Sequence, residues 1–591
     1  MKRKHLTKAS KFKKTPFVEV RNEAYQVING WEAILTKLNE TISSIGKKKK
    51  RVVIETYQGV IHEEVEINLK NGLITDRFVR AEDFMLPEDE IKRLVFPDVT
   101  HDRIFGFLTR LGIDAFYDEK KVHTFREETS QTEGTLVIYG TGAAHLCPDP
   151  DLLVYADMAR WEIQLRMRRH LVDNIGVKNR ETPDWMLLYK QGFFVDWRVC
   201  DRLKKKLFDR WGFVLDTNKQ GQPKLVEGKA VLEGLETASR QPFSVVPFFD
   251  PGPWGGQWMK EACNLGTEPQ NYAWCFNCVP EENSLLLKFG EDVIEIPSVN
   301  LVFRHPHELL GEPVHGRFGD EFPIRYDFLD TMDGGNLSLQ VHPLTEYIQE
   351  KFGMHYTQDE SYYMMDTEDD AVVYLGLKEG VDPEAMIGEL EEAQAGGVSF
   401  NAEKHVQTWP VQKHDHVLIP AGTVHCSGKN SMVLEISSTP YIFTFKLWDW
   451  GRLGLDGKPR PINIEHGKNA IQWNRTTGWT RENLINRIEK VGEGDGWVEE
   501  RTGLHEREFI ETRRHWFTKK TKHDTNGGVH VICLVEGDAV VVESPVNAFE
   551  PFVVNYAEVF IVPAAVGKYT ITPYGTAEGA KCGTLKAYIR H

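Results

Sequence analysis

The chain contains 591 residues, of which 41% are hydrophobic and 27% are charged, and its formal net charge at pH 7 is -16. Such a composition is typical of a globular protein and excludes the disordered and fibrous classes. The length predicts roughly three to four domains, and the excess of acidic residues argues against a general nucleic-acid or anionic-membrane binder.

The sequence also bears on the compartment. No apolar run reaches membrane-spanning length, and the basic N-terminus is not followed by the apolar segment of a secretory signal. Eight cysteines are too sparse for a disulfide framework in so long a chain. We therefore expect a cytoplasmic protein without nucleic-acid or membrane partners, and the sequence indicates no oligomeric state.

Residues 1–240 are expected to form an α/β domain. Apolar segments at 51–55, 135–140 and 152–155 are typical of buried strands, and residues 161–169 have the pattern of an amphipathic basic helix. Short apolar strands that alternate with helices indicate a parallel sheet covered by helices.

The order of these segments resembles the uridine-kinase type of phosphate-loop kinase, with Gly140-Thr141-Gly142 opening a loop after a strand. The loop at residues 55–60 departs from that family because it lacks the GxxxxGK[ST] motif. Without those glycines and that lysine, a backbone nest for phosphates has no means of forming. We therefore expect a degenerate P-loop-kinase-like domain with a structural, regulatory or binding role.

Near residue 240 the sequence changes character, because prolines and glycines such as Pro242 and Gly255 interrupt any helical pattern. Short strands then dominate, for example at 284–289. The economical architecture is two β-barrel units of the jelly-roll type, one over residues 241–510 with helical insertions and one over residues 511–591.

A short strand at residues 337–342 carries polar side chains at alternate positions. Because successive side chains of a strand point to opposite faces, Ser338, Gln340 and His342 share one face. This face is either solvated or a row of donors and acceptors aimed at one site.

Three later segments favour a site. Glu360 stands at the head of a predicted strand, His425 follows a turn, and Glu435 has apolar neighbours. A carboxylate beside a core must be paired, protonated or functional, since burial without partners costs several kcal/mol. With Gln340 and His342, these groups form a mixed nitrogen and oxygen set suited to a divalent ion, and zinc is favoured over manganese, iron or cobalt.

The segments 337–343, 419–425 and 433–436 closely resemble the three hallmark segments of type I phosphomannose isomerases, which are metalloenzymes of the cupin fold. Supporting similarities lie at 254–256 and 448–452. The resemblance covers roughly residues 245 to 591 and leaves the N-terminal part outside it.

This resemblance implies a metal-dependent aldose–ketose isomerase that interconverts mannose 6-phosphate and fructose 6-phosphate through a cis-enediol. The implied partner is a small-molecule sugar phosphate, and the implied cofactor is one zinc ion per chain. By the same resemblance the zinc ligands are Gln340, His342, Glu360 and His425, Ser338 binds substrate, and the catalytic residues are Glu435, Lys446 and Arg452.

Two positions depart from this family. Gln358 stands where the family usually has a lysine, two residues before the ligand glutamate, and Lys446 stands where it usually has the catalytic arginine. A lysine keeps the charge but loses the planar fork that grips an oxyanion with two bonds. The alternatives are therefore an isomerase of another sugar or sugar phosphate, or a non-catalytic sugar-binding regulatory protein.

Overall fold

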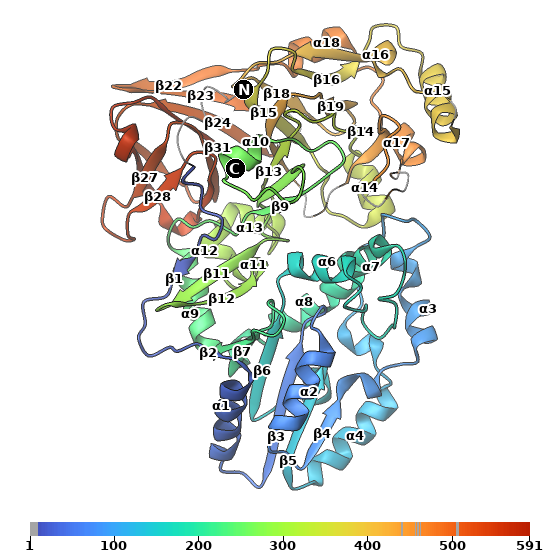
Figure 1. Ribbon diagram of the computed structural model, residues 1–591, viewed down its shortest axis with the longest axis vertical. Helices are drawn as coiled ribbons and strands as arrows, with labels where there is room; N and C mark the ends of the chain where they lie inside the picture. Colours follow the sequence, from blue (N-terminus) through green and yellow to red (C-terminus); the bar gives the residue numbers. More distant parts are fainter. Residues whose placement is uncertain are drawn as a thin grey trace.

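A computed structural model describes residues 10–396, 398–438, 441, 443–454, 457, 460, 462–503 and 508–591. An α/β part, built mainly from residues 28 to 240, lies at one end of the molecule, and β-sheets from the later residues fill the other end, where the N-terminus also lies (Figure 1). The expected multidomain architecture with many β-sheets is confirmed.

A seven-stranded sheet forms the centre of the α/β part, with the strand order β2-β8-β7-β6-β3-β5-β4. The strands from β7 to β4 in this order run parallel; at one edge β8 pairs antiparallel with β7, and β2 pairs antiparallel with β8. The predicted parallel sheet is confirmed, whereas the likeness to a phosphate-loop kinase stays a prediction. The strands are β2 (Ile28–Asn29), β3 (Lys49–Thr56), β4 (Arg77–Arg80), β5 (Gly134–Gly140), β6 (Leu152–Asp157), β7 (Phe213–Asp216) and β8 (Lys224–Glu227).

The central strand β3 is covered on both faces. Its residues Val52, Val53 and Ile54 are all buried, which is typical of a parallel strand between layers of helices. The longer helices of this part are α1 (Trp31–Ser44), α2 (His62–Gly72), α3 (Glu88–Val99), α4 (Glu119–Gln131), α6 (Arg160–Arg168), α7 (Trp185–Gln191), α8 (Trp197–Lys205) and α9 (Gly228–Ser239).

The carboxylate of Glu55, near the end of β3, accepts hydrogen bonds from the backbone N–H groups of Gly142 (2.6 Å) and Ala144 (2.7 Å). Gly142 lies in the turn after β5 and Ala144 in the short helix α5 (Ala143–Leu146) that follows, so a side chain of the protein itself occupies the place where the N–H groups converge. Burial raises the pKa of Glu55 to about 8, although both N–H groups oppose the shift.

Two antiparallel sheets of the central part face each other, because Glu360 on one sheet and His425 on the other have side-chain atoms 2.8 Å apart. The six-stranded sheet contains β9 (Phe248–Asp250), β10 (Trp274–Cys278), β13 (Arg325–Asp330), β15 (Glu360–Thr367), β18 (His416–Ile419) and β20 (Ser431–Ser437). The five-stranded sheet contains β14 (Leu339–Val341), β16 (Val372–Leu377), β17 (Val406–Pro410), β19 (His425–Ser427) and β21 (Phe445–Trp448).

Strand pairing aligns polar residues across each of these sheets. Gln340 on β14 pairs with His425 on one side and with Lys446 on the other. In the opposite sheet, Glu435 on β20 pairs with Asp327 on β13. Because cross-strand partners project from the same face, each sheet presents a polar row to the space between the sheets.

Two more antiparallel sheets form the C-terminal part. They begin at Glu489, since β22 and β23 join the sheet of strands that follow residue 510. The division of the chain near residues 240 and 510 remains a proposal. The strands are β22 (Glu489–Gly494), β23 (Trp497–Gly503), β24 (Ile510–Phe517), β25 (Thr521–Asp524), β26 (His530–Glu536), β27 (Ala539–Glu543), β28 (Phe552–Asn555), β29 (Val559–Val562), β30 (Lys568–Pro573) and β31 (Cys582–Ile589).

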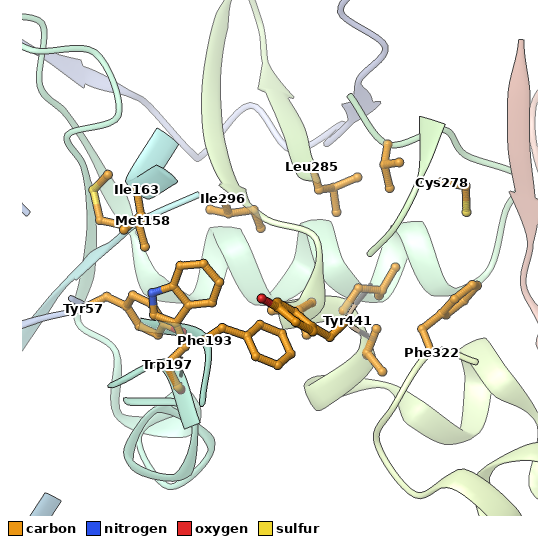
Figure 2. Close-up of a cluster of buried hydrophobic side chains, with 14 of the residues drawn as sticks. Tyr57, Met158, Ile163, Phe193, Trp197, Cys278, Leu285, Ile296, Phe322 and Tyr441 are labelled. Carbon is orange, nitrogen blue, oxygen red and sulfur yellow. Dashed lines mark hydrogen bonds between the residues drawn. The ribbon is translucent and has the colours of Figure 1, made fainter. Parts of the chain in front are cut away.

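The α/β part and the β-rich part share one hydrophobic core. Figure 2 shows Trp197 and Phe193 of the α/β part in line with Tyr441 of the β-rich part, and the rings of Phe193 and Tyr441 have centroids 4.1 Å apart. Strand β1 (Val18–Glu19) pairs in parallel with β11 (Ser284–Phe289), which also pairs with β12 (Asp292–Pro297). Within the described ranges, no helix is long and apolar enough to cross a membrane.

Candidate metal centre

Three predicted ligands meet in the interior between the two central sheets. His342 follows β14, Glu360 opens β15 and His425 opens β19, and each is at most 1% exposed. One ligand atom from each lies within 4.8 Å of the others. The structure therefore brings together residues that are separated by up to 83 positions in the sequence, from 342 to 425.

Backbone carbonyls orient both imidazoles. Nδ1 of His342 donates to the carbonyl oxygen of Phe443 (2.9 Å), and Nδ1 of His425 donates to that of Thr423 (2.8 Å). In the neutral form of each imidazole, Nε2 therefore carries a lone pair, as a metal ligand requires. These two atoms lie 3.1 Å and 2.8 Å from different oxygens of Glu360.

The donor set fits a divalent metal. Apart from the close contacts between Glu360 and the two imidazoles, the buried atoms His342 Nε2 and Glu360 Oε1 have no hydrogen-bond partner within the described part of the chain, which is costly for polar atoms unless a cation shares them. Burial alone would raise the pKa of Glu360, but the two imidazoles outweigh this effect and hold the pKa well below its usual range. An ionised carboxylate with two imidazoles suits zinc.

Gln340 lies beside this group. Its amide nitrogen Nε2 is 3.2 Å from Nε2 of His425. The two ends of an amide have nearly the same shape, so a half turn of the group directs the oxygen at the same point. Gln340 is thus placed to act as a fourth ligand.

A cavity of about 290 Å³ adjoins the metal centre. Ser338, Gln340, Glu435 and Lys446 all line it, so most of the predicted substrate and catalytic residues share one space. Arg452 is outside this lining, and its guanidinium pairs with Asp449 at 2.6 Å.

Two groups in the cavity have shifted proton affinities. Burial, with further effects from Glu360 and Asp327, raises the pKa of Glu435 well above its usual range. Burial and the nearby guanidinium of Arg460 lower the pKa of Lys446 to about 7. A carboxyl group with a raised pKa beside an amine with a lowered pKa is suited to acid–base chemistry.

The amide of Gln358 connects the metal centre to the cavity. Its Nε2 donates to Glu360 Oε2 (3.0 Å) and, more weakly, to Glu435 Oε1 (3.4 Å). Its Oε1 accepts from the backbone N–H of Phe443 (3.1 Å). A neutral amide thus bridges two carboxyl groups at a position where the resemblance led us to expect a cation.

Several residues of the cavity were not predicted from the sequence. Asp327 had a usable signal, because it alternates with apolar residues in the strand 325–330 as Glu435 does in its own strand. The others gave none, since they come from distant segments that only the tertiary fold brings to the cavity. They include Trp161, Gln164, Arg168, Trp185, Arg460 and Asn463.

Comparisons with known proteins match different parts of the chain. A family model described as a domain of unknown function (DUF8485) matches residues 30–240. Mannose-6-phosphate isomerase ManA of Bacillus subtilis (strain 168) is 24% identical over 237 residues, which cover 39% of this chain and 68% of that protein. A mannose-6-phosphate isomerase of Streptococcus mutans serotype c is 26% identical over 220 residues, which cover 37% of this chain and 64% of that protein.

The solved structures that resemble this fold include the mannose 6-phosphate isomerase from Bacillus subtilis, with a TM-score of 0.49 and 18% identity, covering 59% of this chain and 100% of that one. The homologues named mannose-6-phosphate isomerase confirm the resemblance predicted from the three motif segments.

Proposed function

We propose that the protein is a metal-dependent aldose–ketose isomerase that interconverts mannose 6-phosphate and fructose 6-phosphate through a cis-enediol. The observation that carries this proposal is a buried His342–Glu360–His425 group beside a cavity that holds Glu435 and Lys446. The match to homologues named mannose-6-phosphate isomerase supports the choice of sugar.

In this proposal His342, Glu360 and His425 hold one zinc ion, with Gln340 as the fourth ligand. When bound, the ion supplies a Lewis acid that polarises the sugar oxygens. The carbonyls of Phe443 and Thr423 keep the imidazoles turned toward the ion.

The chain's own residues would move the proton. Aldose–ketose exchange moves one proton between C1 and C2 and a second proton between their two oxygens, so a single group beside both carbons can accept the first proton and return it. Glu435 has the raised pKa that suits this role, and it borders the cavity. Lys446 lies on the opposite sheet, and its protonated amine would stabilise the negative charge of the enediolate. Arg452 lies outside the lining of the cavity and would contribute to the cationic side of the site only indirectly, through its ion pair with Asp449.

A second candidate is an isomerase of another sugar or sugar phosphate. The neutral Gln358 between Glu360 and Glu435 favours it, because it leaves the cavity with one cation fewer than the resemblance leads us to expect. A third candidate is a sugar-binding regulatory protein, which would bind a sugar in this cavity without converting it.

A coupled assay with a panel of phosphorylated and free sugars, together with metal analysis of the purified protein, tests the proposal. We expect zinc in the wild type, turnover of mannose 6-phosphate, and loss of both in His342→Ala. Turnover confined to another sugar would support the second candidate. A metal-free protein without turnover would support the regulatory reading.

A further inference from the structure

One face of helix α6 borders the cavity of the metal centre. Trp161, Gln164 and Arg168 recur at intervals of three and four residues, so they lie on the same side of the helix. All three line the same cavity as Ser338 and Gln340. A helix of the α/β part, which lies at the junction with the β-rich part in Figure 1, thus forms part of the wall.

This face of α6 carries N–H groups without acceptors. Trp161 and Gln164 are 5% and 4% exposed, and neither Trp161 Nε1 nor Gln164 Nε2 makes a hydrogen bond within the described part of the chain. The same holds for Nε of Arg168. On another side of the helix, the guanidinium of Arg166 donates to the carbonyl oxygens of Gly59 and Asn218, so its donors are satisfied inside the domain.

Neighbouring groups fix these side chains. The guanidinium of Arg168 makes two bonds to the carboxylate of Asp250, at 2.8 Å and 3.0 Å, and it lies 4.8 Å from the ring centroid of Trp185. The ring of Trp161 packs against Phe276, with centroids 5.0 Å apart. The indole of Trp161 and the guanidinium of Arg168 are therefore already ordered, which lowers the entropic cost of binding a ligand.

Buried donors without acceptors are rare in folded proteins because each one lowers stability. Three such donors on one helical face, in the wall of a cavity, match a ligand that is rich in acceptor oxygens. The aromatic rings beside them suit the C–H face of a sugar. Hydroxyl and phosphate oxygens share this acceptor chemistry.

We infer that the α/β part is itself part of the substrate site, and that α6 binds the oxygen-rich end of the sugar that lies away from the reacting carbons, through Trp161, Gln164 and Arg168. The placement of the reacting carbons at the metal rests on the proposed function. The two parts of the chain, which share a continuous core, then each hold one end of the same ligand.

The test compares variants of the full-length, zinc-loaded protein by calorimetry with mannose 6-phosphate, mannose and inorganic phosphate. Trp161→Phe removes one N–H group and keeps an aromatic ring, and Gln164→Met removes the amide and keeps the length. We expect each to weaken the binding of mannose 6-phosphate roughly ten-fold, with unchanged zinc content.

Matched controls make the same changes elsewhere in the α/β part. Trp211→Phe and Gln191→Met replace a buried tryptophan and a buried glutamine that are outside the lining of the cavity. These variants should bind mannose 6-phosphate as tightly as the wild type. Thermal unfolding of all four variants identifies any that fails to fold.

The outcomes separate this inference from the proposed function. If Trp161→Phe and Gln164→Met bind every probe like the wild type, or if the wild type binds none of the probes, the inference is wrong. If the variants lose affinity but the wild type does not isomerise the sugar, the inference stands and the proposed function fails. If the variants lose affinity only for mannose 6-phosphate and inorganic phosphate, α6 binds the phosphate group. If they lose affinity equally for mannose, α6 binds the hydroxyl groups of the sugar.

Discussion

Phe105 of the α/β part stacks on Phe443 of the β-rich part, with ring centroids 5.2 Å apart and ring planes inclined by 21°. The backbone carbonyl of Phe443 accepts the hydrogen bond that orients His342. The backbone N–H group of Phe443 donates to Oε1 of Gln358. The orientation of a proposed metal ligand therefore depends on a ring that the other part of the chain holds in place.

Replacing Phe105 with alanine should weaken metal binding as well as the fold. We expect Phe105→Ala to lower the free energy of unfolding by about 3–5 kcal/mol and the zinc affinity by about 10–100-fold. Phe125→Ala is the control, because Phe125 is also buried but packs on Phe84 within the α/β part. Competition with a fluorescent chelator measures the affinity, and equal zinc affinities in the two variants would contradict the proposed coupling.

Removing a ligand should abolish metal binding. Because changes to groups that merely orient ligands already cost about 10–100-fold in affinity, His342→Ala should lose more than that. Elemental analysis measures the zinc content, and treatment with a chelator followed by added zinc should remove and restore activity in the wild type. His355→Ala, at an exposed histidine that pairs with Glu321, should retain the metal. Full zinc content in His342→Ala would refute the centre described here.

A positive charge at residue 358 should change the preference among sugars. Gln358→Lys adds a cation in the wall of the cavity, and a charge at a few ångströms is worth about 1 kcal/mol or more. We therefore expect the ratio of kcat/KM for mannose 6-phosphate to that for mannose to rise roughly ten-fold. Gln349→Lys, at an exposed position on α14 (Thr345–Phe352), should leave the ratio unchanged. An unchanged ratio in Gln358→Lys would mean that the phosphate does not approach this residue.

The stability of the fold should depend on His416 in acid. Burial, with a smaller effect of Arg514, lowers the pKa of His416 to about 3, so the folded protein keeps this imidazole neutral. The unfolded chain takes up a proton near pH 6.5, and stability is therefore lost as the pH falls from 6.5 toward 3. Between pH 7 and pH 5 this loss amounts to about 2 kcal/mol.

Denaturant titrations at several pH values check this expectation. His416→Phe should flatten the acid limb of the stability curve, because phenylalanine does not titrate, whereas His123→Phe at an exposed site should not. The same acid limb in His416→Phe and the wild type would show that other groups cause the loss.

The α/β part should not bind ATP. The loop after β3 lacks the glycines and lysine of a phosphate loop, and the carboxylate of Glu55 already occupies the N–H groups of Gly142 and Ala144. Calorimetry with ATP and magnesium should give no binding heat, and thermal unfolding should not shift. Stabilisation by ATP would overturn the interpretation of a degenerate domain.

The sequence predicted features that depend on local pattern. Consecutive apolar residues such as Val52 to Ile54 indicated a buried parallel strand, and alternation placed Gln340 and His342 on one face of a strand. Both signals work because the period of the pattern follows the backbone geometry.

Features that depend on distant partners could not be predicted in this way. The basic helix at 161–169 was expected, but its periodicity does not say which cavity it will face. Arg168 illustrates the limit, because its partner Asp250 lies 82 positions away. Residue types indicated a possible metal site, and the resemblance to a known family then implied which four residues are its ligands.

The pairing of β1 with β11 determines the order in which parts of this chain can fold during synthesis on the ribosome. Val18 and Glu19 leave the exit tunnel early, yet the residues they pair with, Leu287 and Lys288, emerge after the whole parallel sheet has been synthesised. Strand β1 therefore stays unpaired while the parallel sheet of the α/β part folds. Vectorial synthesis thus leaves the seam between the two parts to close late, when β11 becomes available.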